Sequence, residues 1–172
     1  MKEIVPKLRR VVTFYDPHNP VAIESSKFAR GAARQMGIQF VERHIVSGEE
    51  LQASVRALRT GEVDAYFAVS DPIAANQAQV IIDTARTKRL PTMFDFLSFV
   101  IKGGLASYAV SFREVGRLSA KYVQRILTGV KPKDLPVEEV HKIELVINLK
   151  AAKQIGLTIP PNVLARADKV IK

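Results

Sequence analysis

The chain has 172 residues, no cysteine and a formal net charge of +9, and 47% of its residues are hydrophobic. This length fits one domain with a proper core, since a domain usually holds about 100 to 200 residues, and no apolar stretch approaches the roughly 20 residues of a membrane span. The positive residues are scattered and no nucleic-acid-binding motif accompanies them, so we expect no nucleic-acid partner, and the lack of cysteine excludes disulfides and thiolate chemistry.

Strands and helices alternate along the first hundred residues. Four apolar runs rich in β-branched and aromatic residues predict buried strands at residues 11–15, 38–43, 63–69 and 90–94. The helices between them are predicted to begin at Pro20, after Ser47, which forms a capping box with Glu50, and after Asp71. Apolar residues at helical spacing should form the buried face of the first helix: Val21, Phe28, Ala32, Ala33 and Met36. The core face of the third helix is predicted to be Ala74, Ala78, Ile81, Ile82 and Ala85.

In the last part of the chain the pattern changes. Ser111 and Glu114 have the form of a second capping box and predict a helix that runs to Leu127. This helix should bury an apolar stripe: Phe112, Val115, Ser119, Tyr122, Val123 and Ile126. Residues 131–136 have the composition of a linker. A last strand at residues 143–147 and two short helices, the second beginning after Pro160 and Pro161, complete the predicted elements.

This order of elements predicts an α/β fold, a parallel sheet with helices on both faces joined by right-handed crossovers. We expect a main βα lobe at residues 1–102. A crossover helix and linker should follow at residues 103–136, and a final strand and helices at residues 137–172 should return to the lobe.

Polar side chains follow three of the predicted strands. In open α/β sheets, ligands bind beyond the carboxyl ends of the strands, so these loops are the candidate site. The first loop also offers the backbone amides of a helix start, and the last sets a carboxylate beside an aromatic ring, a pair suited to an amino group on an apolar body. The expected ligand contacts are Asp16, Asn19, Ser70, Asp71, Asp95 and Phe96.

Each of these residues also has a structural interpretation, because Asp16 and Asn19 fit a proline-set turn and Asp71 fits a helix cap. Asp16, Asp71 and Asp95 could instead gather around Mg²⁺, as in receiver-like α/β domains, although the lysine expected after a later strand is missing. The chain has no phosphate-binding loop, nucleophile elbow or metalloprotease helix, and its three histidines lie in unrelated segments. We therefore expect no catalysis, no cofactor and no metal.

One stretch, IELVINLKAAKQIGLTIPPNVLARADKVI at residues 143–171, matches a whole sequence pattern. It resembles the ending of substrate-binding proteins of ABC importers related to the tryptophan and tyrosine transport group. The resemblance continues upstream, in family order, through PKDLPVEEVHKIELVINL, GGLASYAVSFREVGRLSAKYVQRILTG, VDAYFAVSDP and FYDPHNP. It implies a type I periplasmic-binding-protein fold that closes over a small organic solute, such as an amino acid, and presents it to an ABC permease. The implied location is periplasmic or otherwise extracytoplasmic.

Members of this family have two lobes, a secretion signal and a complete first lobe ahead of the position that matches Lys7. Residues 1–6 are too short and too mixed for a signal peptide, so the chain resembles the second half of such a protein. Without the first lobe, the apolar stripe of the helix at residues 111–127 would meet water, at a cost of about 25 cal/mol for each Å². We therefore expect this helix to fold onto its own sheet or to pair with a second copy in a homodimer.

Two other functions are compatible with this sequence. The same two-lobed fold serves as the effector-sensing part of transcription regulators, so a ligand-sensing regulatory domain is one alternative. A structural dimerisation domain without a ligand is the other. The residues themselves do not identify the solute.

Overall fold

The computed structural model describes all residues from 1 to 172. Its strands are β1 (Arg10–Tyr15), β2 (Gln39–His44), β3 (Ala65–Phe67), β4 (Thr92–Phe94), β5 (Ala106–Val110), β6 (Ile143–Asn148) and β7 (Lys169–Ile171). They form one sheet in the order β2-β1-β3-β4-β5-β6-β7. β1 to β5 are parallel, whereas β6 runs antiparallel to β5 and β7 lies parallel to β6. The predicted α/β fold is confirmed: the sheet is mostly parallel, and the pairing of β5 with β6 is its antiparallel part.

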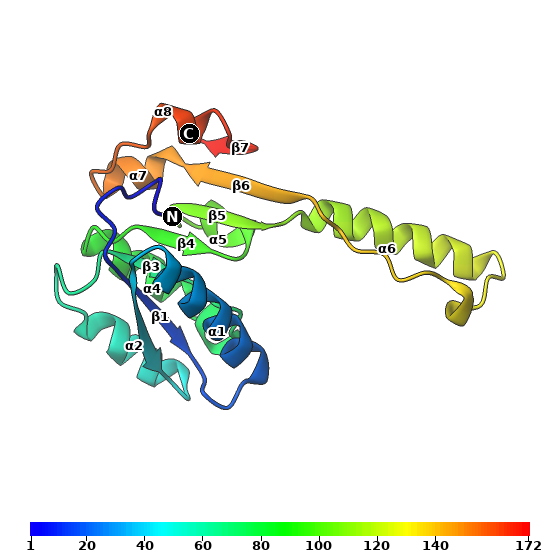
Figure 1. The fold of residues 1–172 in the computed structure, drawn as a ribbon, viewed down its shortest axis with the longest axis horizontal. Coiled ribbons are helices and arrows are strands. Elements are labelled where there is room, and N and C mark those ends of the chain that lie inside the picture. Colours follow the sequence, from blue (N-terminus) through cyan, green and yellow to red (C-terminus); the bar gives the residue numbers. More distant parts are fainter.

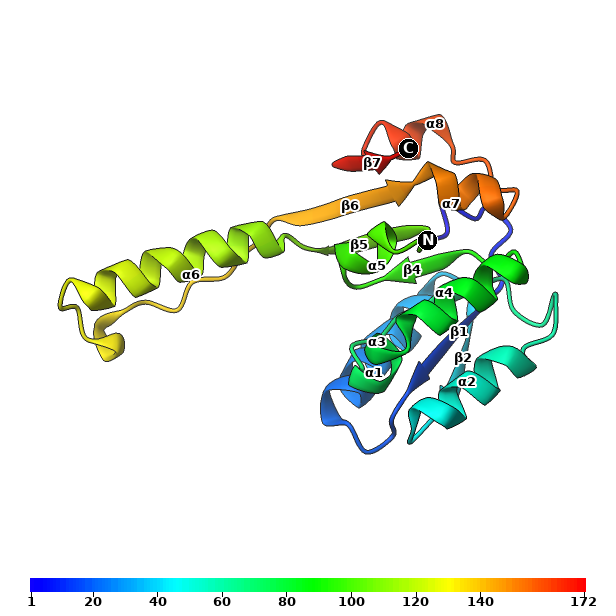
Figure 2. The same cartoon turned by 180° about the vertical axis from the view of Figure 1, so that it is seen from behind.

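Helices lie on both faces of this sheet (Figures 1 and 2). They are α1 (Pro20–Gln35), α2 (Gly48–Ala57), α3 (Pro72–Asn76), α4 (Ala78–Thr87), α5 (Leu97–Ile101), α6 (Phe112–Leu127), α7 (Leu149–Gln154) and α8 (Pro161–Leu164), with a 3₁₀ turn at Pro132–Asp134. Alternate residues of a strand point to opposite faces. Val12 and Phe14 therefore pack with α2, α3 and α4, and Val11 and Tyr15 pack toward α1.

The inward face of α1 differs from the predicted one. Val21, Phe28 and Met36 are 59%, 71% and 53% exposed, so the predicted apolar stripe is wrong for its large residues, and only Ala33 of the five packs against the core. The helix instead faces the sheet with small side chains: Ala22, Ser26, Ala29 and Ala33. Small side chains let a helix approach a sheet closely, and a search for large apolar residues at helical spacing passes over them.

The predicted third helix consists of two helices, α3 and α4. They meet at Gln77, whose side-chain oxygen accepts a 3.0 Å hydrogen bond from Gln52 Nε2 of α2. The predicted core face is confirmed, since all five of its residues are buried: Ala74, Ala78, Ile81, Ile82 and Ala85. The apolar spacing was therefore informative even where the helix is interrupted.

Residues 111–142, here called the arm, extend away from the sheet (Figures 1 and 2). The arm holds α6 and the segment that returns beside it, and no residue of α6 is buried. The expectation that this helix buries its stripe against its own sheet is therefore wrong. Tyr122 instead packs along the returning segment, with its hydroxyl donating to Pro136 O and lying 3.1 Å from Glu138 Oε1.

The second predicted capping box is also wrong. The Ser111 hydroxyl donates to Glu144 Oε1 at 2.9 Å, and the Ser111 amide donates to Lys142 O at 2.9 Å. Glu114 forms an ion pair with Arg117, 3.3 Å away, and does not reach back to Ser111. The serine therefore ties the root of the arm to β6 and its approach, and the helix begins without a side-chain cap.

Sequence patterns missed three elements: β5, α5 and β7. β5 is not a continuous apolar run, since its sequence is ASYAV, and it pairs with β6, which lies more than thirty residues later in the chain. The final helix stops at Leu164, and the chain then forms β7, whose approach is fixed by a 2.8 Å hydrogen bond from the Leu145 amide to Asp168 Oδ2. None of the helices combines the length and apolar character that crossing a bilayer requires.

Candidate functional site

A cavity of about 310 Å³ opens beyond the carboxyl ends of β3 and β4. The start of α1, the loop after β3, helix α3 and the segment from β4 to α5 line it. Five of the six predicted contact residues meet there: Asn19, Ser70, Asp71, Asp95 and Phe96. The other lining residues are Val21, Tyr66, Ala68, Val69, Pro72, Ala74, Ala75, Phe94 and Phe99. The cavity thus lies where open α/β sheets bind ligands.

Asp71 connects two walls of the cavity. Its side chain is almost completely buried, and Asp71 Oδ1 accepts a 2.9 Å hydrogen bond from the Ala74 amide at the start of α3. Asp71 Oδ2 accepts a 3.0 Å hydrogen bond from the Asp16 amide in the loop after β1. The predicted helix cap is confirmed, and the same carboxylate holds the loop after β1 in place.

Asp16 is the predicted contact residue that does not line the cavity. Asp16 Oδ1 accepts a 2.8 Å hydrogen bond from the His18 amide and lies 3.0 Å from His18 Nδ1. These contacts hold the pKa of Asp16 below its ordinary value, the backbone hydrogen bond having the largest effect. The carboxylate is therefore occupied within its own turn, the structural role that its sequence context also suggested.

Asn19 caps α1 at the edge of the cavity. Its Oδ1 accepts hydrogen bonds from the Val21 and Ala22 amides at 3.0 and 3.4 Å. The sequence suggested that the amides of this helix start could bind a ligand, but the Asn19 side chain already accepts from the first of them. Asn19 lines the cavity, and its side-chain amide nitrogen forms no hydrogen bond within the chain.

Asp95 is the carboxylate at the end of β4, and it lacks a partner from any other residue. Burial raises the pKa of its carboxyl above the ordinary value. The neighbouring Tyr66 is 2% exposed, and burial, followed by the charges of Asp95 and Asp71, raises the pKa of its hydroxyl. The cavity is therefore both apolar and negatively charged.

Aromatic rings continue from the core to the mouth of the cavity. Tyr66 contacts Phe94 with ring centroids 5.6 Å apart, and Phe94 contacts Phe99 at 5.3 Å. Phe99 meets Phe96 edge-on at 5.8 Å, and Phe96 stacks with Phe112 of α6 at 5.0 Å and 22°. Sequence reasoning missed Tyr66 and Phe99 as site residues because they belong to apolar runs typical of the core.

The three aspartates of the alternative magnesium site do not form one. The structure places no group of three or more His, Cys, Asp or Glu side chains where they could hold a metal ion. Asp71 is occupied by two backbone amides and Asp16 by His18, which leaves Asp95 alone at the cavity.

Sequence comparison gives the family. The family described as ABC transporter substrate binding protein matches residues 1–171. The chain belongs to this family. It is a family of transport proteins, typically extracytoplasmic, and not a class of enzymes.

This substrate-binding protein has the same fold as several solved structures. A conserved domain protein from Vibrio cholerae is 31% identical, with a TM-score of 0.87 over 98% of this chain and 57% of its own. An ABC domain from Streptococcus pneumonia, solved in complex with L-Trp, is 26% identical, with a TM-score of 0.86 over 99% of this chain and 59% of its own. A substrate-binding protein with adhesive properties from Clostridium difficile shares the fold at 20% identity and a TM-score of 0.74, over 99% of this chain and 57% of its own. The chain thus spans less than two thirds of each of these structures.

Proposed function

We propose that this chain is the solute-binding lobe of an ABC importer's substrate-binding protein and that its solute is a small organic molecule such as an amino acid. The observation that carries the proposal is the cavity at the strand ends, where an unpaired carboxylate, Asp95, lies among aromatic rings in a chain of this family. The Streptococcus pneumonia structure, which holds L-Trp, supports an amino acid as the solute.

The lining residues suggest distinct roles. Asp95 receives a donor or positive group of the solute, and Phe96 packs against its apolar part. Ser70 and Asn19 provide neutral hydrogen bonds, and Asp71 shapes the wall while its oxygens hold the loops. Asp16 does not line the cavity, so its expected contact with the solute stays a prediction.

This lobe supplies one side of the binding site. A pocket usually buries about 70 to 90% of its ligand, and one lobe provides about half of that contact. If a complete site binds with a Kd of about 1 μM, roughly −8 kcal/mol, half of that free energy corresponds to a Kd near 1 mM. We therefore expect weak solute binding by this chain, with the opposite wall supplied by a second lobe or a second copy.

The proposed mechanism is transport without chemistry. Closure over the solute would create a surface that an ABC permease recognises outside the cytoplasm. No reaction of the solute is needed, and the free carboxylate serves binding.

Backbone-amide NMR during titration with a panel of amino acids tests the proposed function, because it detects millimolar binding. We expect saturable shifts at residues 19, 70–71 and 94–99, and the largest shifts for amino acids with aromatic or large apolar side chains. Calorimetry that shows submicromolar binding to a monomer would contradict the half-site. Complete absence of shifts across the panel and across sugars and polyols would contradict solute binding.

The arm favours a second proposal, a homodimer. Five large apolar residues of the arm are exposed: Phe112, Val123, Ile126, Leu127 and Val137. Covering them with a second copy would remove apolar surface from water. Native mass spectrometry over a range of concentrations should show a dimer that Val123→Asp weakens and the neighbouring Gln124→Asp leaves intact. A monomer at every concentration would reject this assembly.

A further inference from the structure

The cavity carries charge of one sign. The whole chain has a net charge of +9, yet the cavity is lined by Asp71 and Asp95 and by no lysine, arginine or histidine. A cleft whose charged groups share one sign, with apolar walls, concentrates ligands of the opposite sign. The lining therefore attracts a cation and offers no counter-ion to a carboxylate.

Only one of the two carboxylates is available. Asp71 uses one oxygen for the Ala74 amide and the other for the Asp16 amide. Asp95 has no partner outside its own residue, and burial penalises its ionised form. A ligand ammonium group beside Asp95 would stabilise the ionised form of the half-buried carboxylate. The carboxylate would in turn bind the ammonium group through charge-assisted hydrogen bonds.

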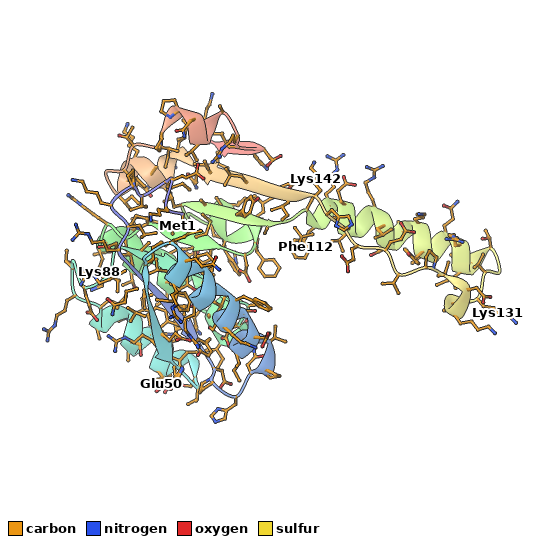
Figure 3. All side chains as sticks on the ribbon, in the orientation of Figure 1. Met1, Glu50, Lys88, Phe112, Lys131 and Lys142 are labelled. Atoms are coloured by element: carbon orange, nitrogen blue, oxygen red, sulfur yellow. The ribbon has the colours of Figure 1, made fainter.

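The arm brings an additional aromatic ring, Phe112, against Phe96, which lines the cavity, although Phe112 itself is not a lining residue. Phe112 is the first residue of α6, at the root of the arm (Figure 3), and it stacks on Phe96 with ring centroids 5.0 Å apart. Its neighbour Ser111 is fixed by hydrogen bonds to Glu144 and Lys142, so the start of the helix is held in position. Phe112 is nevertheless 56% exposed, which leaves ring surface free for contact.

We propose that this cavity is the half of the solute site that binds an organic ammonium group on an aromatic or apolar body. Asp95 is the counter-ion, and Phe96 and Phe112 form the aromatic platform on which the body packs. This inference rests on the proposed function and adds to it the end of the solute that this lobe recognises. An amino acid's carboxylate then lies outside this lobe, because the lining holds no cation.

Three probes with the same phenyl ring distinguish recognition of an ammonium group from recognition of a carboxylate group. In NMR titrations of the full chain, we expect 2-phenylethylamine to bind about tenfold more tightly than 3-phenylpropionate, a factor equal to about 1.4 kcal/mol. L-Phenylalanine, which carries both charged groups, should fall between them. The shifts should lie at residues 94–99 and 112.

Two substitutions test the assigned residues. Asp95→Asn should remove the preference for the amine and leave 3-phenylpropionate bound as well as before or better. Phe112→Leu should weaken all three probes at least about threefold, roughly 0.7 kcal/mol. Phe28→Leu is its matched control, because Phe28 is 71% exposed on α1 and, unlike Phe112, does not stack on a ring that lines the cavity. The amide spectrum of each variant establishes that it is folded.

The results distinguish this inference from the proposed function. Tighter or equal binding of 3-phenylpropionate would overturn the ammonium half-site, while binding of L-phenylalanine at the same residues would leave solute binding intact. An unchanged affinity in Phe112→Leu would remove Phe112 from the platform. No binding of any probe, together with no binding of amino acids, would overturn both the inference and the proposed function.

Discussion

The Asp71 carboxylate binds the backbone amide of Asp16, fifty-five residues earlier in the chain, at 3.0 Å. Its other oxygen accepts from Ala74, so a residue that caps α3 also fixes the loop after β1. Because both donors are backbone amides, the shape of the cavity depends on this one buried side chain. A helix cap alone would leave the position of that loop to weaker contacts.

Substitutions at Asp71 should separate the cap from the bridge. Asp71→Asn keeps an oxygen for Ala74 but turns an amide group toward the Asp16 amide, so we expect a loss of about 1 kcal/mol in unfolding free energy. Asp71→Ala loses both acceptors and should cost about 2 to 3 kcal/mol. Urea unfolding followed by circular dichroism measures both, with Ser47→Ala, which removes only a cap, as the control. An Asp71→Asn variant as stable as the original chain would show that the bridge to Asp16 adds nothing.

Asp95→Asn should stabilise the fold while it weakens binding. Burial raises the pKa of Asp95 in the folded state, so the folded chain holds this proton more tightly than the unfolded chain. Stability therefore falls as the pH rises from the ordinary value of 3.8 through the raised pKa. We expect a higher Tm for Asp95→Asn at pH 7 and a difference that closes below pH 3.8. Asp134→Asn, at an exposed site on the arm, is the control, and a lower Tm for Asp95→Asn at pH 7 would contradict the assignment.

A polar network joins β1, β2 and α1 at a second position. Tyr15 donates its hydroxyl proton to Glu42 Oε1 at 2.9 Å, and Arg30 donates to both Glu42 oxygens at 2.8 and 2.9 Å. Burial alone would raise the pKa of Glu42, but the hydrogen bonds from Arg30 and Tyr15 outweigh it and lower the pKa. The network therefore stabilises the ionised form.

Glu42→Gln should destabilise the chain at neutral pH. We expect a loss of about 1 kcal/mol, below the usual range for hydrogen bonds to a charged group because Arg30 is half exposed to solvent. A lowered folded-state pKa gives stability that is present above the ordinary value of 4.5 and lost as the pH falls through the folded pKa. The difference between the two proteins should therefore close in acid, as denaturant unfolding at a series of pH values would show. A difference that persists unchanged at low pH would assign the loss to packing.

The sequence predicted β1 to β4 because buried parallel strands are short, nearly continuous apolar runs bounded by turn residues. It also located most of the cavity, since polar residues directly after such strands must meet at one edge of the sheet. Asp95 and Phe96 could be found this way because they directly follow β4, a strand that its own residues predict. Tyr66 could not, because an aromatic residue inside a strand has the pattern of the core whether or not it also lines a cavity.

Errors arose where structure depends on distant partners. β5 forms between β4 and the much later β6, so its own five residues carry little signal. The stripe of α6 has the spacing of a buried face, although no residue of that helix is buried. Ser111 met the capping-box pattern but bonds Glu144 instead, because hydrogen bonding to a neighbouring strand competes with local capping. The contact of Phe112 with Phe96 could not be predicted without the path of the arm.

Two glycines should respond oppositely to alanine. A Cβ on Gly104 would lie 2.6 and 2.7 Å from two ring carbons of Phe94 and 2.9 Å from the Phe99 carbonyl oxygen. A Cβ on Gly31, inside α1, would have no neighbouring atom within 4 Å. Gly104→Ala should therefore cost about 2 to 3 kcal/mol through overpacking, whereas Gly31→Ala should gain about 1 kcal/mol from helix propensity.

The Gly104 substitution should also reach the cavity, because Phe94 lines it and contacts both Tyr66 and Phe99. To avoid the clash, the Phe94 ring must move toward the cavity or the chain at Phe99 must shift, and either movement displaces the aromatic rings that line it. We expect Gly104→Ala to weaken 2-phenylethylamine binding under conditions where the variant is fully folded, while Gly31→Ala leaves the affinity unchanged. Unaltered binding in a folded but destabilised Gly104→Ala would show that the clash relaxes away from the cavity. That outcome would mean that the rings of the site are not rigidly coupled to the packing of β4 against the start of β5.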